Sequence, residues 1–267
     1  MRIENFRVAA MTAGETFWRG ANLRAAEARA ELARRAELAR MPAPEGITGP
    51  PLRRLLGELG VLGRRSMGSL EPYESVNPHG VMMLPGFGAH PLRMRRMKRA
   101  LEDAGHRPHE WGLGFNLGPT TENFDFLLRR VADLAEQEGQ PIALVGWSLG
   151  GLFAREIARR EPQHVRKVIT LGTPFSGDPH ANNAWRAYHL ITGHAVDAPP
   201  IEVDFSTKPP VPTIALWSPK DGVIAPRAAA GWPHERDRAV AVRCNHLAFA
   251  ADPQSIQEVL RQLDFDD

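Results

Sequence analysis

One serine of the chain stands between two glycines in a setting typical of a nucleophile. Residues 146–150 read Gly-Trp-Ser-Leu-Gly, directly after a short apolar run and directly before a predicted helix. A strand, a tight turn and a helix in this order can hold the hydroxyl of Ser148 at the end of a sheet, open to substrate. The glycines leave room for a turn this tight. The pattern predicts a nucleophile elbow with Ser148 as the attacking group in acyl transfer.

A serine hydroxyl needs a base to take its proton, and the base needs a partner that orients it. His246 follows a short predicted strand and precedes the last predicted helix, which makes it the candidate base. Asp221 lies in an Asp-Gly turn just past the apolar run that ends at Trp217, which makes it the candidate acid. Parallel strands present their carboxyl ends at one edge of a sheet, so we expect these side chains to meet Ser148 there. Asp178, which follows an earlier predicted strand, is an alternative acid.

Two backbone N–H groups are expected to face the negative charge that develops on the substrate oxygen. One belongs to Leu149, directly after the serine, where the helix N-terminus also favours negative charge. The second is expected in the loop 85–89, which reads Pro-Gly-Phe-Gly-Ala and follows the apolar run 81–84. Its two glycines let the backbone approach closely, so Phe87 is the predicted second donor.

The single cysteine, Cys244, lies two residues from His246 but has no elbow of its own. Free cysteines are most often buried and inert, so we predict no thiol nucleophile. The spacing of His, Cys and acidic residues predicts no metal site, and we expect no cofactor. The N-terminus lacks the apolar core of a secretory signal, and no apolar run is long enough for a membrane span. These features favour a cytoplasmic protein.

Composition is compatible with one large core and does not indicate a nucleic-acid partner. The chain has 267 residues, of which 43% are hydrophobic, enough for an α/β domain of ordinary size. Its formal net charge is only +2, and no basic face is evident along the sequence. Composition therefore leaves a small-molecule or lipid substrate as the expected partner. It does not predict an oligomeric state.

Short apolar runs alternate with helical patterns from His79 onward. The predicted strands are 81–84, 110–114, 142–145, 168–171, 211–217 and 239–243, and the predicted helices are 92–104, 121–138, 149–160 and 253–263. This alternation predicts an α/β fold, a mostly parallel sheet flanked by helices. All the candidate catalytic residues then follow the ends of strands.

Residues 1–78 differ from the rest and are predicted to form an N-terminal helical extension to a catalytic domain at 79–267. A helix rich in Ala, Arg and Glu is predicted over 19–40. A second helix over 52–65 carries leucines on one side and arginines on the other. Two interpretations of this amphipathic helix remain: it docks on its own domain, or it contacts a membrane or lipid surface.

The stretch 178–210 is predicted to form a small cap above the ends of the strands. It contains Trp185 and Tyr188 in a short predicted helix. These side chains either line an apolar acyl pocket beneath a movable lid or complete the core of the domain. Trp147, beside the serine, is a third candidate for the substrate pocket.

Residues 79–265 resemble the α/β-hydrolase superfamily, particularly its bacterial lipase- and esterase-like members. The resemblance rests on Leu-Pro-Gly-Phe-Gly at 84–88, Trp-Gly-Leu-Gly-Phe-Asn-Leu-Gly-Pro at 111–119, Gly-Trp-Ser-Leu-Gly-Gly at 146–151, Leu-Gly-Thr-Pro at 171–174, Asp-Gly-Val at 221–223 and Asn-His-Leu at 245–247. It implies hydrolysis of carboxylic esters through an acyl-serine intermediate. The elbow is also similar to that of the pimeloyl-ester carboxylesterases, which implies that a short-chain ester could be the substrate.

The chain departs from the family pattern at two positions. Pro85 stands where many members have a histidine before the glycine of the oxyanion loop, and Trp147 stands where many lipases have a histidine. Two alternatives to ester hydrolysis also stay open, because a fold does not determine a reaction. One is an acyltransferase or thioesterase on the same fold. The other is a non-catalytic binding protein that uses its N-terminal extension as the interaction surface.

Overall fold

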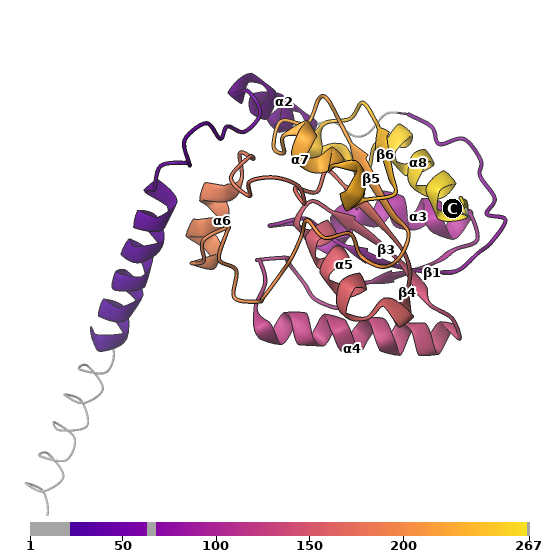
Figure 1. The fold of residues 1–267 in the computed structure, drawn as a ribbon, viewed down its shortest axis with the longest axis horizontal. Coiled ribbons are helices and arrows are strands. Elements are labelled where there is room, and N and C mark those ends of the chain that lie inside the picture. The colour runs from indigo at the N-terminus through magenta and orange to yellow at the C-terminus, as the bar shows by residue number, and fades with distance from the viewer. Residues whose placement is uncertain (1–21, 63–67, 266–267) are drawn as a thin grey trace, which may run out of the picture.

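A parallel sheet with helices on both faces forms the body of the molecule (Figure 1). The computed structural model describes residues 22–62 and 68–265. Within them, six strands pair in the order β2-β1-β3-β4-β5-β6, and every pairing is parallel. The strands are β1 (Gly80–Leu84), β2 (Arg107–Glu110), β3 (Ile142–Trp147), β4 (Val165–Leu171), β5 (Thr213–Trp217) and β6 (Arg238–Ala241).

Helices connect the strands, and two further helices precede the first strand within the described residues. Residues 22–40 are helical. The helices that follow are α2 (Leu52–Leu62), α3 (Arg95–Asp103), α4 (Thr121–Glu138), α5 (Leu149–Arg160), α6 (Trp185–Thr192), α7 (Pro226–Ala230) and α8 (Pro253–Asp264). Four short 3-10 turns are η1 (Pro91–Met94), η2 (Pro162–His164), η3 (Pro233–Glu235) and η4 (His246–Ala248).

Apolar residues on both sides of the strands bury the sheet between two layers of helices. Val81 and Met83 of β1 pack with α3 and α8 on one face, whereas Met82 and Leu84 pack with α4 and α5 on the other. A strand buried on both faces needs a continuous apolar run rather than an alternating one. This is why β1 and β3 are recognisable in the sequence as unbroken apolar stretches.

The predicted fold class is confirmed, and the largest difference from the predicted elements lies at the edge of the sheet. The strand predicted at 110–114 is instead β2 at Arg107–Glu110, which pairs only with β1. An edge strand needs few apolar residues, and β2 reads Arg-Pro-His-Glu. Trp111, which suggested the later position, is buried in the core just beyond the end of the strand. The helix predicted at 92–104 is divided into η1 and α3, and α7 was not predicted.

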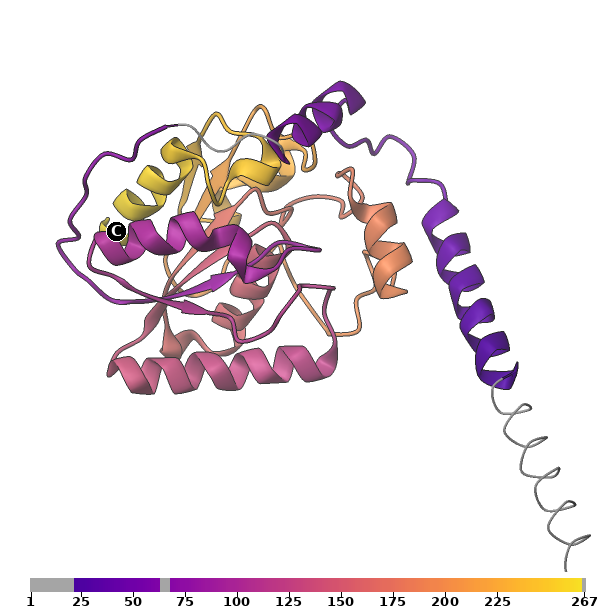
Figure 2. The same ribbon diagram turned by 180° about the vertical axis from the view of Figure 1, so that it is seen from behind.

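The N-terminal helix (22–40) projects from the body on the side of α6, as both views show (Figures 1 and 2). Arginine side chains attach it to the last turn of α6 and the residue beyond. Arg35 donates to the carbonyl of Ile191 at 2.7 Å, and Arg34 donates to that of Gly193 at 3.1 Å. Residues 19–21 and 63–65 of the two predicted N-terminal helices lie outside the described residues. The described part of the second, α2, lies against the body of the protein.

We expect Leu144→Ala to destabilise the protein by about 2–5 kcal/mol, because Leu144 is fully buried in β3 and its removal leaves a cavity in the core. The measurement is the free energy of unfolding from urea titration. Leu92→Ala is the matched control, since Leu92 is 63% exposed, and it should change stability by about 0.5 kcal/mol or less. Equal effects of the two substitutions would contradict this account of the core.

Candidate active site

Ser148 occupies a strained turn between β3 and α5. Its backbone angles are φ 53° and ψ −121°, and it is the only non-glycine residue with positive φ in the described part of the chain. Such a conformation costs about 1–3 kcal/mol and persists only where the surrounding structure holds it in place. The N–H of Ser148 donates to the carbonyl of Leu171, and its own carbonyl accepts from the Thr173 hydroxyl at 2.9 Å. Contacts to the end of β4 therefore support the strained turn.

Glycines allow the neighbouring backbones to approach this turn. A Cβ at Gly146 would collide with the backbone of Gly151. A Cβ at Gly150 would collide with the carbonyl of Leu84, at the end of β1. The first turn of α5 consequently lies directly against the ends of two strands, which fixes where the side chain of Ser148 emerges.

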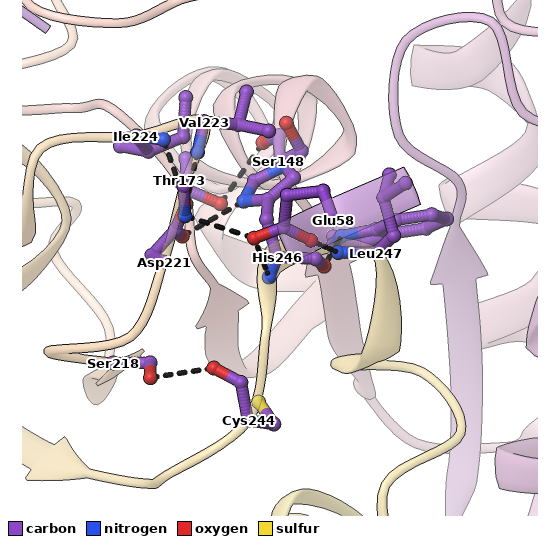
Figure 3. Close-up of polar contacts among 12 residues, drawn as sticks. Glu58, Ser148, Thr173, Ser218, Asp221, Val223, Ile224, Cys244, His246 and Leu247 are labelled. Atoms are coloured by element: carbon purple, nitrogen blue, oxygen red, sulfur yellow. Dashed lines mark hydrogen bonds and ion pairs between the residues drawn. The ribbon is translucent and has the colours of Figure 1, made fainter. Parts of the chain in front are cut away.

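His246 and Asp221 form a buried hydrogen-bonded pair beside this turn (Figure 3). Nδ1 of His246 lies 2.8 Å from Oδ2 of Asp221, and the two residues are 3% and 0% exposed. The other carboxylate oxygen, Oδ1, accepts from the N–H groups of Val223 at 2.8 Å and Ile224 at 2.7 Å. An ionised carboxylate can only accept, so Nδ1 carries the hydrogen of this bond and Nε2 is the ring nitrogen that can take a proton.

The structure brings Ser148, Asp221 and His246 together at the C-terminal ends of the strands (Figure 3). A Cβ at Gly172, just past β4, would lie 3.0 Å from Oδ2 of Asp221 and 3.1 Å from Nδ1 of His246. The indole Nε1 of Trp147, the residue before Ser148, donates to the carbonyl of His246 at 3.1 Å. Among the described residues, no hydrogen bond joins the Ser148 hydroxyl to His246.

The alternative acid, Asp178, has a different partner. Its Oδ1 lies 2.8 Å from Nδ1 of His180 and also accepts from the N–H of that residue. The structure thus pairs His246 with Asp221, and Asp178 with the histidine two residues after it. Both aspartates follow strands, and the contact with His246 agrees with the sequence analysis, which favours Asp221 over Asp178.

The loop that contains Phe87 lies against the turn at Ser148. A Cβ at Gly86 would lie 3.3 Å from the Cβ of Ser148. In the part of the chain that the structure describes, the N–H groups of Phe87 and Leu149 donate to no other group. Both residues line the cavity described below. The two predicted oxyanion donors are therefore close to Ser148 and available to a ligand.

Asn116 holds this loop in place, a role that the sequence analysis did not predict. It is fully buried, and its Nδ2 donates to the carbonyl of Pro85 at 2.7 Å. Its backbone carbonyl accepts from Gly88, and its N–H donates to Ala89. A buried asparagine in a glycine-rich segment was the available signal, but it identifies no partner.

A cavity opens at Ser148 and is lined mainly by apolar side chains. Among the residues that the structure describes, Glu156 is the only charged side chain in its wall and Asn182 the only amide. The carboxylate of Glu156 is paired with Arg159 at 2.7 Å and with Arg160 at 2.6 Å. Because these two arginines neutralise the one charge in the wall, the cavity suits an uncharged, apolar group.

Two of the three residues predicted for a substrate pocket, Trp185 and Tyr188 of α6, line this cavity. The ring of Tyr188 lies 5.5 Å from that of Phe87, so α6 contacts the loop 85–89. Burial raises the pKa of Tyr188 to about 12, which disfavours the phenolate form in the wall of the cavity. Trp147 does not line the cavity, because its side chain is buried in the core and its indole N–H is directed to His246.

Cys244 is buried behind the site and faces the core. Its carbonyl accepts from the hydroxyl of Ser218 at 2.6 Å. Burial raises the pKa of the Cys244 thiol, which disfavours the reactive thiolate.

We expect the thiol of Cys244 to be unreactive in the native protein at about pH 8, where an ordinary cysteine is partly ionised. The measurement is the rate of reaction with Ellman's reagent, compared between native protein and protein in concentrated urea. The raised pKa and the burial should both slow the native reaction, and unfolding should remove both effects. Equal rates in the two states would contradict this description of Cys244.

Glu58 of α2 contacts the candidate site and was not predicted. Its carboxylate is 1% exposed and accepts backbone hydrogen bonds from both loops that carry Asp221 and His246 (Figure 3). A signal for it did exist in the sequence, because Glu58 is the only acidic residue in the stretch 52–65. It lies three residues after Leu55 and four after Arg54, at the border between the leucine and arginine sides of the helix, so the pattern identifies no partner for it.

The described ranges 22–62 and 68–265 were searched for metal-ligand clusters and for membrane-spanning helices. No three His, Cys, Asp or Glu residues gather there as a set of metal ligands. Nor is any helix in these ranges both long enough and apolar enough to cross a membrane.

Comparison with known proteins agrees with this fold. Residues 81–192 match the family model described as the α/β hydrolase fold. Pimeloyl-[acyl-carrier protein] methyl ester esterase of Vibrio campbellii is 40% identical over 70 residues. That alignment spans 26% of this chain and 27% of the curated relative, so little more than a quarter of the relative is matched.

Solved structures show the same architecture at low sequence identity. A lipase-esterase related protein from Clostridium acetobutylicum aligns with a TM-score of 0.51 and 14% identity, over 72% of this chain and 95% of that one. A structure reported for the metagenome-derived lipolytic enzymes LipS and LipT gives 0.50 and 16%, over 74% and 97%. Together with the family match, these alignments establish that this chain has the α/β-hydrolase fold, as the sequence motifs predicted.

Proposed function

We propose that this protein is a serine hydrolase that cleaves carboxylic esters through an acyl-serine intermediate. The observation that carries the proposal is the buried Asp221–His246 pair, whose free ring nitrogen lies at the same sheet edge as the strained Ser148. An α/β-hydrolase fold presents its catalytic serine in this kind of turn. The local similarity to a methyl ester esterase supports an ester as the substrate.

In the proposed reaction, Oγ of Ser148 attacks the ester carbonyl carbon while Nε2 of His246 takes the hydroxyl proton. The carbonyl oxygen becomes negatively charged and accepts hydrogen bonds from the N–H groups of Phe87 and Leu149. The carbon–oxygen bond to the alcohol then breaks, and His246 gives its proton to the leaving oxygen. Asp221 keeps the ring oriented and stabilises the imidazolium.

In the second half of the reaction, water replaces the alcohol. His246 takes a proton from water as the water oxygen attacks the acyl carbon, and the same two N–H groups hold the second oxyanion. Collapse of this intermediate breaks the bond to Ser148 Oγ, which regains its proton from His246. The products are a carboxylic acid and an alcohol, and the enzyme returns to its starting state.

The apolar cavity indicates that the substrate carries an apolar acyl or alcohol group next to the ester. Its wall includes Trp185 and Tyr188 of α6, and we propose that the segment 178–210 is a cap over the site. The catalytic domain then begins at about residue 79, and the preceding segment is an extension whose helix α2 reaches the site.

We expect the protein to hydrolyse p-nitrophenyl esters and Ser148→Ala to lose about 10⁴-fold or more of that activity, because the nucleophile is gone. The series from acetate to palmitate measures the length of group that the cavity accepts. A fluorophosphonate probe should label the wild type and leave Ser148→Ala unlabelled. Wild-type protein that neither turns over any ester nor takes the probe would overturn the proposal and favour a binding protein. Acyl transfer to an added alcohol in preference to water would favour a transferase.

We expect Asp221→Asn to lower kcat by about 10⁴-fold, because an amide in place of the carboxylate no longer enforces the hydrogen on Nδ1 of His246. Asp178→Asn is the matched control, since Asp178 is hydrogen-bonded to His180 instead. Its kcat should stay within about threefold of wild type. The reverse order of effects would identify Asp178 as the acid and contradict the assignment.

A further inference from the structure

We propose that Glu58 is a positioning residue for the Asp221–His246 pair, so that helix α2 of the N-terminal segment forms part of the active site. The inference concerns the catalytic site and in that respect rests on the proposed function. Glu58 touches neither the cavity nor Ser148, and it acts through the backbone of the residues that it holds.

The carboxylate of Glu58 binds three backbone N–H groups. Oε1 accepts from Gly222 at 2.8 Å and from His246 at 2.9 Å, and Oε2 accepts from Leu247 at 3.0 Å. Glu58 is only 1% exposed, so water does not compete with these bonds. Hydrogen bonds to an ionised acceptor are roughly twice as strong as neutral ones.

These bonds join the two loops on either side of the Asp–His contact. Gly222 is the residue directly after Asp221, and His246 is the base candidate itself, so a single oxygen of Glu58 bridges both loops (Figure 3). The loops are also joined where they leave the sheet, by the hydrogen bond from Ser218 to the carbonyl of Cys244. Glu58 adds a further connection, next to the Asp221–His246 contact.

The backbone of α2 packs directly against both of the loops that Glu58 connects. Gly222 has no side chain, and a Cβ there would collide with the carbonyl of Arg54 and lie 2.8 Å from the N atom of Leu55. On the other loop, Nδ2 of Asn245 donates to the carbonyl of Gly57 at 3.2 Å. Both loops thus contact the main chain of α2 as well as the Glu58 side chain.

A purely structural role and a positioning role predict different kinetics. None of the α2 residues whose side chains the structure describes lines the cavity, so the loss of Glu58 should leave substrate binding unchanged. Movement of the Asp221 and His246 loops by a fraction of an ångström would instead misalign proton transfer. A misplacement of about 1 Å can cost about 100-fold in rate.

The test uses the full chain with Glu58→Ala, Glu58→Gln and the matched control Glu45→Ala, which removes an exposed carboxylate of the same segment. We expect Glu58→Ala to lower kcat on p-nitrophenyl esters by about 10- to 100-fold, with KM within about threefold of wild type. The kcat of Glu58→Gln should fall between those of Glu58→Ala and wild type. The amide oxygen of Gln still accepts a hydrogen bond, but its NH₂ group faces a donor. Glu45→Ala should match wild type. Thermal unfolding of each variant shows that it is folded at the assay temperature.

A second readout does not depend on ester turnover. The Nδ1 proton of His246, bonded to a buried carboxylate, should give a downfield proton NMR resonance that Asp221→Asn abolishes. We expect Glu58→Ala to weaken or remove this resonance and Glu45→Ala to retain it. Should Glu58→Ala fail to fold, Glu58→Gln, which keeps the size of the side chain, gives the same comparison.

The outcomes separate this inference from the proposed function. A folded Glu58→Ala with wild-type kcat and an unchanged resonance would overturn the positioning role and leave ester hydrolysis intact. A change in KM alone would overturn it as well. Wild-type protein that is inert on esters, yet loses its resonance in Glu58→Ala, would refute ester hydrolysis and support the role of Glu58 in holding the pair.

Discussion

The hydrogen bond between Asp221 and His246 joins two loops, and the candidate site depends on the distance between these loops. The two residues are 25 positions apart in the chain and meet because β5 and β6 are neighbours in the sheet. One oxygen of Asp221 is held by two backbone N–H groups, so the other is left in a fixed position for the imidazole. Because Asp221 and His246 are both buried, water does not compete for the hydrogen bond between them. The tautomer of His246, and with it the nitrogen that faces substrate, follows from this arrangement.

The strained turn at Ser148 is the complementary constraint. It stands at the end of β3, which is paired on both edges and buried on both faces, so the sheet can hold an unfavourable backbone conformation. Trp147 links the turn to the loop of His246, because its indole is buried beneath the site and donates to the carbonyl of that residue. The favourable packing of the core thus compensates for the strained backbone at Ser148 and holds that residue in place at the end of the sheet.

The two N-terminal helices contact different parts of the body. Helix 22–40 is held by arginine–carbonyl bonds at the C-terminal end of α6, the helix whose Trp185 and Tyr188 line the cavity. Helix α2 contributes Glu58 to the loops of Asp221 and His246. One helix therefore contacts α6 behind the cavity wall, and the other supports the candidate catalytic pair. Leu52 and Leu56 of α2 remain exposed, and a lipid contact of that surface stays a prediction.

The sequence by itself determined the fold class and the elbow, because both depend on local patterns. Continuous apolar runs predict buried strands, and glycines on either side of Ser148 predict a tight turn, whatever lies further along the chain. The sequence favoured Asp221 over Asp178 as the partner of His246, but only the tertiary structure brought the two side chains into contact. It also directed Trp147 into the core and brought Glu58 to the site. Hydrophobic periodicity records whether a residue is buried and not what it touches, so contacts between distant segments are set by the packing of the sheet and its helices.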